Sequence, residues 1–525
     1  MKQLSILLLS TLLSIPGSAQ EHIDMIITNA RIIDGTGNPW FHGAIGVDDG
    51  KIVQVGDLTE YTSDELIDAE QQIVAPGFID VHAHIESSIF RRPDAENFIR
   101  DGVTSLVTGN CGSSSTDMTG FFQELRDTGI ALNIAALIGH NSVRRAVMGA
   151  ENRTPTATEL DSMKLLVRSA MKAGAVGFST GLIYVPGTYS ETEEVVELAK
   201  VAGEHGGIYA SHMRNEGKNI ADAIAEAVNI GREANLPVEI SHFKVSGKPM
   251  WNKSNMTIDL VRTYREDGLD VTVDQYPYTA SSTTLAVILP SWSLAGGTDS
   301  LSARLENEEL KSQIISEMKE ELTEAEQDDY EYCAVSNCPW EKSYNGKRIP
   351  EVTEMRTGSR SLESQIETIL VMVARGDRVQ MVFHSMNEDD VRHILRSPFT
   401  MIASDAGIPQ FGYNVPHPRA YGTNARVLGR YVREQKVISW EDAIRKMTSL
   451  PASRFKLHNR GLIKKGLAAD LVIFDPETVS DRATFEEPHA YSTGFSHVVV
   501  NGKSVIKAGE STGMRSGIIL ENRNE

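Results

Sequence analysis

Ala75-Pro76-Gly77-Phe78-Ile79-Asp80-Val81-His82-Ala83-His84 is the stretch on which the interpretation of this 525-residue chain rests. An apolar strand leaves a Pro-Gly turn and ends in two histidines, His82 and His84, two positions apart. Alternate side chains of an extended strand share a face, so both imidazoles point the same way at the strand's end. Two imidazoles placed in this way are typical of a metal site.

Four more residues of metal-ligand type follow strand-like segments. Neutral imidazoles, a thiolate and a carboxylate together suit a borderline-soft divalent ion such as Zn²⁺. Such an ion lowers the pKa of its bound water to about 7 and polarises a carbonyl group, so hydroxide becomes available at neutral pH. The set predicts a metal-dependent hydrolase in which Asp405 carries the proton from the water to the leaving nitrogen. The four residues are Cys111, His212, His242 and Asp405.

The middle of the chain, residues 76–456, alternates strand-like with helix-length segments, as βα units around a parallel sheet do. Nine segments compete for the eight strands of a (β/α)8 TIM-like barrel, and we expect 380–384 to lie outside it. The ligand-type residues fall at the carboxyl ends of these segments, where barrel active sites lie. The candidates are 78–82, 105–108, 133–138, 176–180, 208–212, 238–242, 271–275, 380–384 and 400–404.

Three other segments lack the alternation of strand-like and helix-length stretches that marks the barrel. Between about 289 and 361 the alternation is lost, which predicts an inserted, mainly helical subdomain. Residues 20–75 and 457–525 hold short strands with hairpin signals at Asp49-Gly50 and Asn501-Gly502. Strand-rich segments at both ends of the chain indicate one small β-sandwich domain built from the two termini.

The first 19 residues resemble an export signal. Lys2 is followed by an apolar run from Leu4 to Leu13 and by small residues before a cleavage site after Ala19. The run is too short to span a bilayer. We therefore expect a mature protein that is secreted or periplasmic.

Composition narrows the class of partner. The net charge is −20, which opposes binding to nucleic acid and to anionic membrane surfaces. Eleven acidic residues against two lysines lie between Glu306 and Glu331, a pattern typical of a solvated helical face. Cys333 and Cys338 are close enough in sequence to form a disulfide, and equally they fit two unpaired structural cysteines. We expect a small-molecule substrate and leave the oligomeric state open.

Several motifs resemble those of the amidohydrolase superfamily, and more closely those of the N-acyl-D-amino-acid deacylases (D-aminoacylases). The resemblance covers nearly all of the chain after the leader. A cysteine, Cys111, stands where most amidohydrolases use a modified lysine. The matching segments are the His-x-His strand, Gly109-Asn-Cys-Gly112, Gly177-Phe-Ser-Thr-Gly-Leu182, Ser211-His-Met-Arg-Asn-Glu216, Ser241-His-Phe-Lys244, Asp274-Gln-Tyr-Pro-Tyr278 and His417-Pro-Arg-Ala-Tyr-Gly422.

The resemblance implies a role for each of these residues. A tightly held zinc ion would be bound by Cys111, His212 and His242. A second, often weaker, metal position would be formed by His82, His84 and Asp405, and Asp405 would be the general acid/base. The substrate carboxylate would be bound by Tyr184, Lys244, Arg419 and a serine, either Ser281 or Ser282. An arginine, a lysine and a phenol suit a carboxylate because they form charge-assisted hydrogen bonds with it.

The resemblance implies hydrolysis of the linear amide of an N-acyl-D-amino acid, or of a dipeptide with a C-terminal D residue. One departure is Glu86, which stands where the family commonly has aspartate; it either hydrogen-bonds to a ligand or reshapes the pocket. A cyclic-amide hydrolase of the dihydroorotase or hydantoinase kind is an alternative, although such enzymes normally use the modified lysine. A non-catalytic scaffold is another, although such relatives tend to lose ligands and all six are present here.

Overall fold

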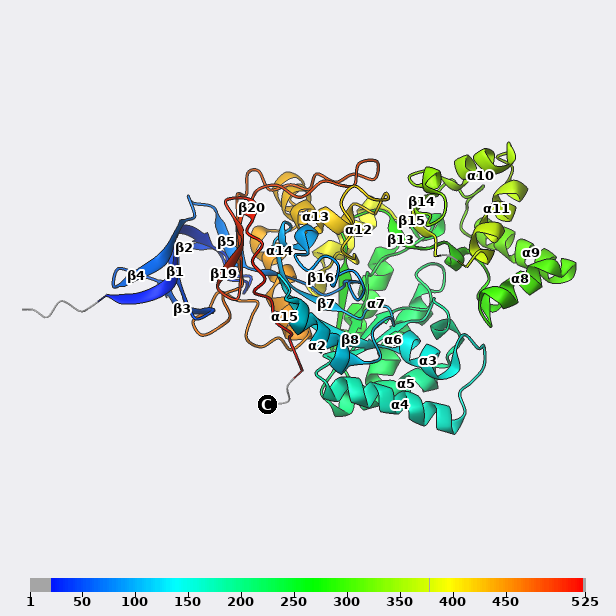
Figure 1. The fold of residues 1–525 in the computed structure, drawn as a ribbon, viewed down its shortest axis with the longest axis horizontal. Coiled ribbons are helices and arrows are strands. Elements are labelled where there is room, and N and C mark those ends of the chain that lie inside the picture. Colours follow the sequence, from blue (N-terminus) through cyan, green and yellow to red (C-terminus); the bar gives the residue numbers. More distant parts are fainter. Residues whose placement is uncertain (1–19, 377, 523–525) are drawn as a thin grey trace, which may run out of the picture.

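The computed structural model describes residues 20–376 and 378–522, so the predicted leader, residues 1–19, lies outside the described residues. Figure 1 shows a β domain at one end, a barrel in the centre and a mainly helical subdomain at the other end. Strands from the two ends of the chain lie side by side in the β domain, where β5(Ile73–Pro76) pairs with β17(Leu471–Phe474). Within the described ranges, no helix has the length and apolar character needed to cross a bilayer.

Eight parallel strands form the barrel in chain order, which confirms the predicted fold class. Ala83 bridges Ala406, and the Asp405 N–H donates to the His82 carbonyl at 2.9 Å, so the first and last strands close the sheet. The interior strands read as apolar runs because both of their faces are covered. The strands are β6(Phe78–Asp80), β7(Val103–Thr108), β8(Asn133–Gly139), β9(Gly177–Gly181), β10(Ile208–His212), β11(Val238–Ile240), β12(Val271–Gln275) and β16(Thr400–Ile402).

Helices cover the barrel and pack on it through one large cluster of buried apolar side chains. The start of α4 is fixed by a capping box, in which the Thr156 hydroxyl accepts from the Glu159 N–H and the Glu159 carboxylate accepts from the Thr156 N–H. The helices are α1(Glu96–Ile99), α2(Met118–Thr128), α3(His140–Met148), α4(Ala157–Lys172), α5(Thr192–Glu204), α6(Ile220–Ala234), α7(Ser254–Glu266), α12(Glu388–Arg396), α13(Arg419–Arg426), α14(Trp440–Met447) and α15(Ser449–Arg454), with the short 3-10 helices η1(Gly187–Tyr189) and η2(Lys248–Met250) and the π-helix η6(Val427–Glu434).

The β domain is one nine-stranded sheet that contains strands from both ends of the chain. Its order is β20-β19-β18-β17-β5-β1-β2-β3, and β4 pairs with β1. Asn501 and Gly502 have φ of 48° and 76°, as a two-residue hairpin turn requires. The strands are β1(Glu21–Ile32), β2(Phe41–Asp48), β3(Lys51–Gly56), β4(Tyr61–Asp68), β5(Ile73–Pro76), β17(Leu471–Phe474), β18(Phe495–Val500), β19(Lys503–Lys507) and β20(Glu510–Ser511).

A buried ionic network joins the β domain to the amino-terminal end of the barrel. Asp470 forms an ion pair with Arg460, and both side chains are buried. The same carboxylate accepts from the Asn133 side chain at 3.0 Å and from the Asn501 N–H at 2.8 Å. Because Asn133 begins β8 and Asn501 lies in the β18–β19 turn, these contacts fix the β domain against the barrel.

The inserted subdomain has its own hydrophobic core, which extends from Leu285 to Phe383. Its three-stranded sheet has the order β13-β15-β14, so the segment Gln380–Phe383 lies outside the barrel as expected. Cys333 and Cys338 are both buried and free. The elements are β13(Ser281–Thr284), η3(Leu285–Ile288), η4(Ser291–Leu294), α8(Thr298–Glu306), α9(Glu308–Glu324), β14(Cys333–Asn337), η5(Lys342–Tyr344), α10(Ile349–Thr357), α11(Leu362–Ala374) and β15(Gln380–Phe383).

Candidate metal centre

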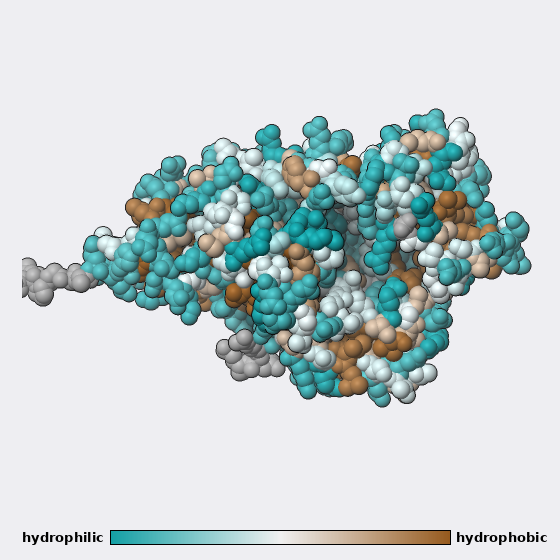
Figure 2. Space-filling view, in the orientation of Figure 1, coloured by the Kyte–Doolittle hydropathy of each residue, from teal (hydrophilic) through white to brown (hydrophobic). Residues whose placement is uncertain are grey.

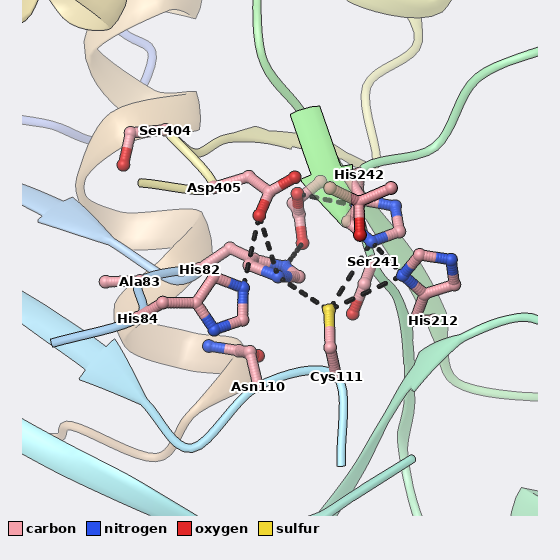
Figure 3. A network of polar contacts seen from close by, with 12 residues as sticks. His82, Ala83, His84, Asn110, Cys111, His212, Ser241, His242, Ser404 and Asp405 are labelled. Carbon is pink, nitrogen blue, oxygen red and sulfur yellow. Dashed lines mark hydrogen bonds and ion pairs between the residues drawn. The ribbon is translucent and has the colours of Figure 1, made fainter. Parts of the chain in front are cut away.

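The six predicted donor residues lie together at the carboxyl-terminal mouth of the barrel, at the ends of five different strands (Figure 3). They come from β6, β7, β10, β11 and β16 or from the residues that directly follow them. Three overlapping groups of three have their ligand atoms within 4.8 Å of one another. The groups are His82, His84 and Cys111; Cys111, His212 and His242; and His82, His242 and Asp405.

Three donors have left-handed backbone conformations just beyond their strands. Cys111, His242 and Asp405 have φ of 52°, 38° and 50°. Residues with a side chain seldom adopt positive φ, and the strain persists only where surrounding contacts hold it, as at functional sites. The Asp274 carboxylate supplies one such contact, because it accepts from the His242 N–H at 2.9 Å. Because the backbone turns sharply at these residues, each side chain points across the mouth of the barrel. It does not follow the alternating direction of the side chains in the strand.

One glycine makes room for this turn. A Cβ atom at Gly181, the last residue of β9, would lie 2.2 Å from the Cys111 carbonyl oxygen. The backbone that carries the thiol therefore passes directly over β9. This accounts for a glycine at the end of the Gly177-Phe-Ser-Thr-Gly181 motif.

The group formed by Cys111, His212 and His242 has the spacing of a zinc site. The Cys111 Sγ lies 3.5 Å from His212 Nδ1 and 3.5 Å from His242 Nε2. With Zn–N bonds of about 2.0–2.1 Å and Zn–S bonds of about 2.3 Å, the donors around a tetrahedral ion are roughly 3.3–3.6 Å apart. The two imidazole nitrogens are 2.7 Å apart, so an ion would separate them slightly. The set of donors and its spacing fit zinc.

The second group shares the sulfur with the first. His84 Nε2 lies 3.2 Å and His82 Nε2 lies 3.6 Å from the Asp405 carboxylate. The Cys111 Sγ is only 3.3 Å from His82 Nε2. The thiol thus lies between the two groups, in a position from which it could serve either ion.

Charges around the thiol and the carboxylate favour their ionised forms. Burial opposes ionisation of Cys111, but His82 and hydrogen bonds from His212 and His242 hold the pKa of its thiol well below the usual range. Burial likewise opposes ionisation of Asp405, and Arg419 is the main group that holds the pKa of this carboxyl well below its usual range. Anionic sulfur and oxygen are the forms that bind a divalent cation.

Two carboxylates behind the donors were missed in the sequence analysis as functional residues. Glu216 Oε1 lies 3.0 Å from His242 Nδ1, and it accepts from the Lys244 ammonium at 2.5 Å. Asp274 Oδ2 lies 3.3 Å from His82 Nδ1. A carboxylate that accepts from one ring nitrogen leaves the lone pair of the other nitrogen free for a metal, a common arrangement at such sites. Both residues fall within matched motifs, and that was the only sequence signal for them.

The predicted substrate-binding residues line the same region. Lys244 is almost fully buried beside His242, and Arg419 forms a 2.9 Å ion pair with Asp405. Both cations lie over the ring of Tyr276, at 5.7 and 4.5 Å from its centroid. The Tyr184 hydroxyl accepts from Thr283 at 3.0 Å.

The structure distinguishes the two candidate serines and places Glu86. The Ser282 hydroxyl donates to the Met381 carbonyl within the small sheet. Both serines line the cavity beside Lys244, and Ser282 also lines the larger cavity. Glu86 contacts no donor side chain directly. Its carboxylate accepts from the Thr108 hydroxyl and the Gly109 N–H, both at 2.7 Å, and so supports the turn that leads to Cys111.

Two cavities meet at the centre. The larger, about 1180 Å³, extends from the barrel mouth toward the inserted subdomain, and the smaller is about 340 Å³. Tyr184, Ser282 and Asp405 line both. The outer surface is largely hydrophilic on the face shown in Figure 2, with hydrophobic patches over the inserted subdomain.

Comparisons with known proteins agree with this architecture. A model of the Amidohydrolase family matches residues 65–278 and 358–506. D-aminoacylase of Alcaligenes xylosoxydans xylosoxydans is 34% identical, covering 96% of this chain and 98% of that protein. N-acyl-D-glutamate deacylase of the same organism is also 34% identical, covering 93% and 94%.

Two solved structures have nearly the same fold. A crystal structure of D-aminoacylase is similar with a TM-score of 0.81 at 34% identity, covering 95% of this chain and all of the other. N-acyl-D-glutamate deacylase from Bordetella bronchiseptica, complexed with zinc and a phosphonate inhibitor that mimics the tetrahedral intermediate, gives 0.80 at 32% identity with the same coverage.

Proposed function

This chain belongs to the amidohydrolase family, and on that basis we propose that it hydrolyses the linear amide of N-acyl-D-amino acids, or of dipeptides with a C-terminal D residue, with zinc as cofactor. The observation that carries the proposal is the meeting of a Cys-His-His donor group, the Asp405 carboxylate and two buried cations where the two cavities join. The similar deacylases support the substrate class, and the zinc-containing relative supports the metal.

The donors assigned to the tighter site are Cys111, His212 and His242, and those assigned to a second, weaker site are His82, His84 and Asp405. A bound divalent ion would lower the pKa of a water molecule and polarise the amide carbonyl. The number of ions in the working enzyme is part of the proposal, and metal analysis of the purified protein tests it.

Asp405 is the proposed general acid/base. Its carboxylate is ionised, lies at the edge of the donor set and lines both cavities, so it can accept a proton from water and deliver it to the amide nitrogen. The ion pair with Arg419 fixes its orientation. Loss of the proton relay would lower turnover far more than it lowers metal content.

Lys244 and Arg419 are proposed to bind the substrate carboxylate, with hydroxyls from Tyr184 and Ser281. The two cations flank the face of the Tyr276 ring, so a carboxylate placed between them would receive charge-assisted hydrogen bonds from both. Lys244 lines the smaller cavity and Arg419 lines the larger, so the carboxylate of the substrate would lie where the two cavities meet.

Release of product from paired N-acetyl D- and L-amino acids, with metal analysis of the same preparation, tests the function. We expect hydrolysis of the D compounds with at least one zinc per chain, and no hydrolysis of dihydroorotate or hydantoins. Activity confined to the cyclic amides or to the L series would overturn the proposal.

Export is the remaining element of the proposal. The leader of residues 1–19 supports secretion or a periplasmic location. Amino-terminal sequencing of the protein recovered from fractionated cells should give Gln20 as the first residue. Recovery of the uncleaved chain in the cytoplasm would remove this element without affecting the chemistry.

A further inference from the structure

The first turn of α3 holds the loop that carries Tyr184. We infer, on the basis of the proposed function, that Asn141 is a positioning residue for substrate binding. Its side-chain amide fixes the backbone of residues 181–184 and so directs the Tyr184 hydroxyl toward the substrate carboxylate.

Asn141 reaches this loop because of its place in the barrel. It is the second residue of α3, which begins directly after β8, and β8 pairs with β9, from whose end the loop departs. The carboxyl ends of both strands lie at the mouth of the barrel, so the first turn of α3 and the loop are neighbours there. The Asn141 side chain is buried between them.

The carboxamide of Asn141 binds the loop through both of its ends. Its Oδ1 accepts from the Gly181 N–H at 3.2 Å, and its Nδ2 donates to the Gly181 carbonyl at 2.9 Å and to the Tyr184 carbonyl at 3.2 Å. One turn further along α3, the Arg145 guanidinium donates to the Val185 carbonyl at 2.7 Å. Asparagine suits this position because its carboxamide offers both an acceptor and donors, whereas an ionised aspartate offers only acceptors.

Two glycines shape the space that the carboxamide fills. A Cβ atom at Gly112, the residue after Cys111, would lie 2.1 Å from Asn141 Oδ1, and a Cβ atom at Gly187 would lie 2.6 Å from Asn141 Nδ2. The N–H of the neighbouring Ser142 donates to the Gly112 carbonyl at 3.0 Å. The Asn141 side chain therefore lies between the turn that carries the thiol and the loop that carries the phenol.

Tyr184 connects this support to the site. Its ring packs edge-on against the His212 ring, with 4.7 Å between centroids, and its hydroxyl accepts from Thr283 at 3.0 Å. Among the residues that the structure describes, the side-chain hydrogen bonds of Asn141 go to Gly181 and Tyr184 and to no metal donor. An effect of Asn141 on substrate binding would therefore act through the position of Tyr184.

Removal of the carboxamide tests the inference. Asn141→Ala deletes three hydrogen bonds to the loop, so we expect KM for N-acetyl-D-amino acids to rise by about tenfold, with little change in kcat or in zinc content. Asn141→Asp, which has nearly the same volume, retains the acceptor but sets a negative charge against two carbonyl oxygens, and it should raise KM at least as much. Native KM in either folded variant would overturn the inference.

Asn133→Ala is the matched control. Asn133 is also buried, and its side chain donates to the Thr104 carbonyl and to Asp470, but it begins β8 at the opposite end of the barrel. We expect this substitution to lower the free energy of unfolding, measured in urea, and to leave KM unchanged. An equal rise of KM in the control would show that Asn141 affects binding only through overall stability, which would overturn the inference.

A double-mutant cycle with Tyr184→Phe separates this inference from the proposed function. If Asn141 acts through the Tyr184 hydroxyl, Asn141→Ala should raise KM by less than about twofold in the Tyr184→Phe background. Additive effects of the two substitutions would overturn the inference and leave the deacylase function intact. Failure of the native enzyme to hydrolyse any N-acyl-D-amino acid would instead refute the proposed function, and the inference with it.

Discussion

Glu216→Gln is the substitution that tests most directly how the outer contacts support the metal centre. The carboxylate accepts from the Lys244 ammonium at 2.5 Å and lies 3.0 Å from His242 Nδ1. An amide retains the shape and one acceptor, but it cannot neutralise Lys244, which is only 2% exposed. Loss of such an outer partner typically costs 10- to 100-fold in metal affinity or activity. Because a buried ammonium is left unpaired, we expect a loss at the upper end of this range. Zinc affinity should fall by nearly 100-fold, or about 2.7 kcal/mol of binding free energy.

Competition with a chelator, followed by metal analysis, gives the affinity of each protein for zinc. Glu226→Gln is the matched control: its side chain has the same exposed fraction, 14%, and among the described residues its hydrogen bonds come from Arg214 and Thr192 and from no metal-donor side chain. We expect the control to retain native affinity. A Glu216→Gln protein with unchanged zinc affinity and unchanged kcat would refute the reasoning, because the carboxylate would then have no influence on His242.

Three further substitutions address the centre and the fold. Cys111→Ala should empty the tighter site, so metal analysis should show loss of zinc together with loss of activity; full retention of both would refute the ligand assignment. Asp405→Asn should lower kcat by about 10²- to 10⁴-fold with a much smaller change in zinc content, and unchanged turnover would remove Asp405 from the proton relay. Asp470→Asn leaves the Arg460 charge buried without its partner, so urea denaturation should show a loss of about 3–5 kcal/mol in the free energy of unfolding, and a change below 1 kcal/mol would contradict the role of this ion pair.

The barrel could be predicted from the sequence because its signals are local. Most of its strands are short, mainly apolar runs with a polar residue at or just beyond their end, and helices such as α4, α5 and α6 are long enough to show their own periodicity. The β domain is less regular at one point, because Asn29 lies within the single strand β1. Asn29 has φ of 51° and the register shifts between Ile27 and Ala30, so a residue with turn propensity is accommodated as a bulge.

The donor histidines and Cys111 were predictable because each is an uncommon residue type at a strand end, and Asp405 was predictable because it follows the last strand of the barrel. Their outer partners were not, because Glu216 and Asp274 are common residue types whose importance arises only from contacts across the barrel. The small cavity could not be predicted from the sequence either. Its walls come from the barrel mouth and from the inserted subdomain, and no periodic pattern shows which faces of the two will meet.

The pairing of β5 with β17 has a consequence for biosynthesis. Residues 73–76 find their partner only when residues 471–474 have left the ribosome, after the entire barrel has been translated. Until then the nascent chain exposes an unpaired edge of hydrophobic strand, which favours intermolecular association. C-terminal truncations that stop before β17 should for this reason accumulate as insoluble material. A circular permutant opened within the inserted subdomain would place both halves of the split sheet in one contiguous stretch.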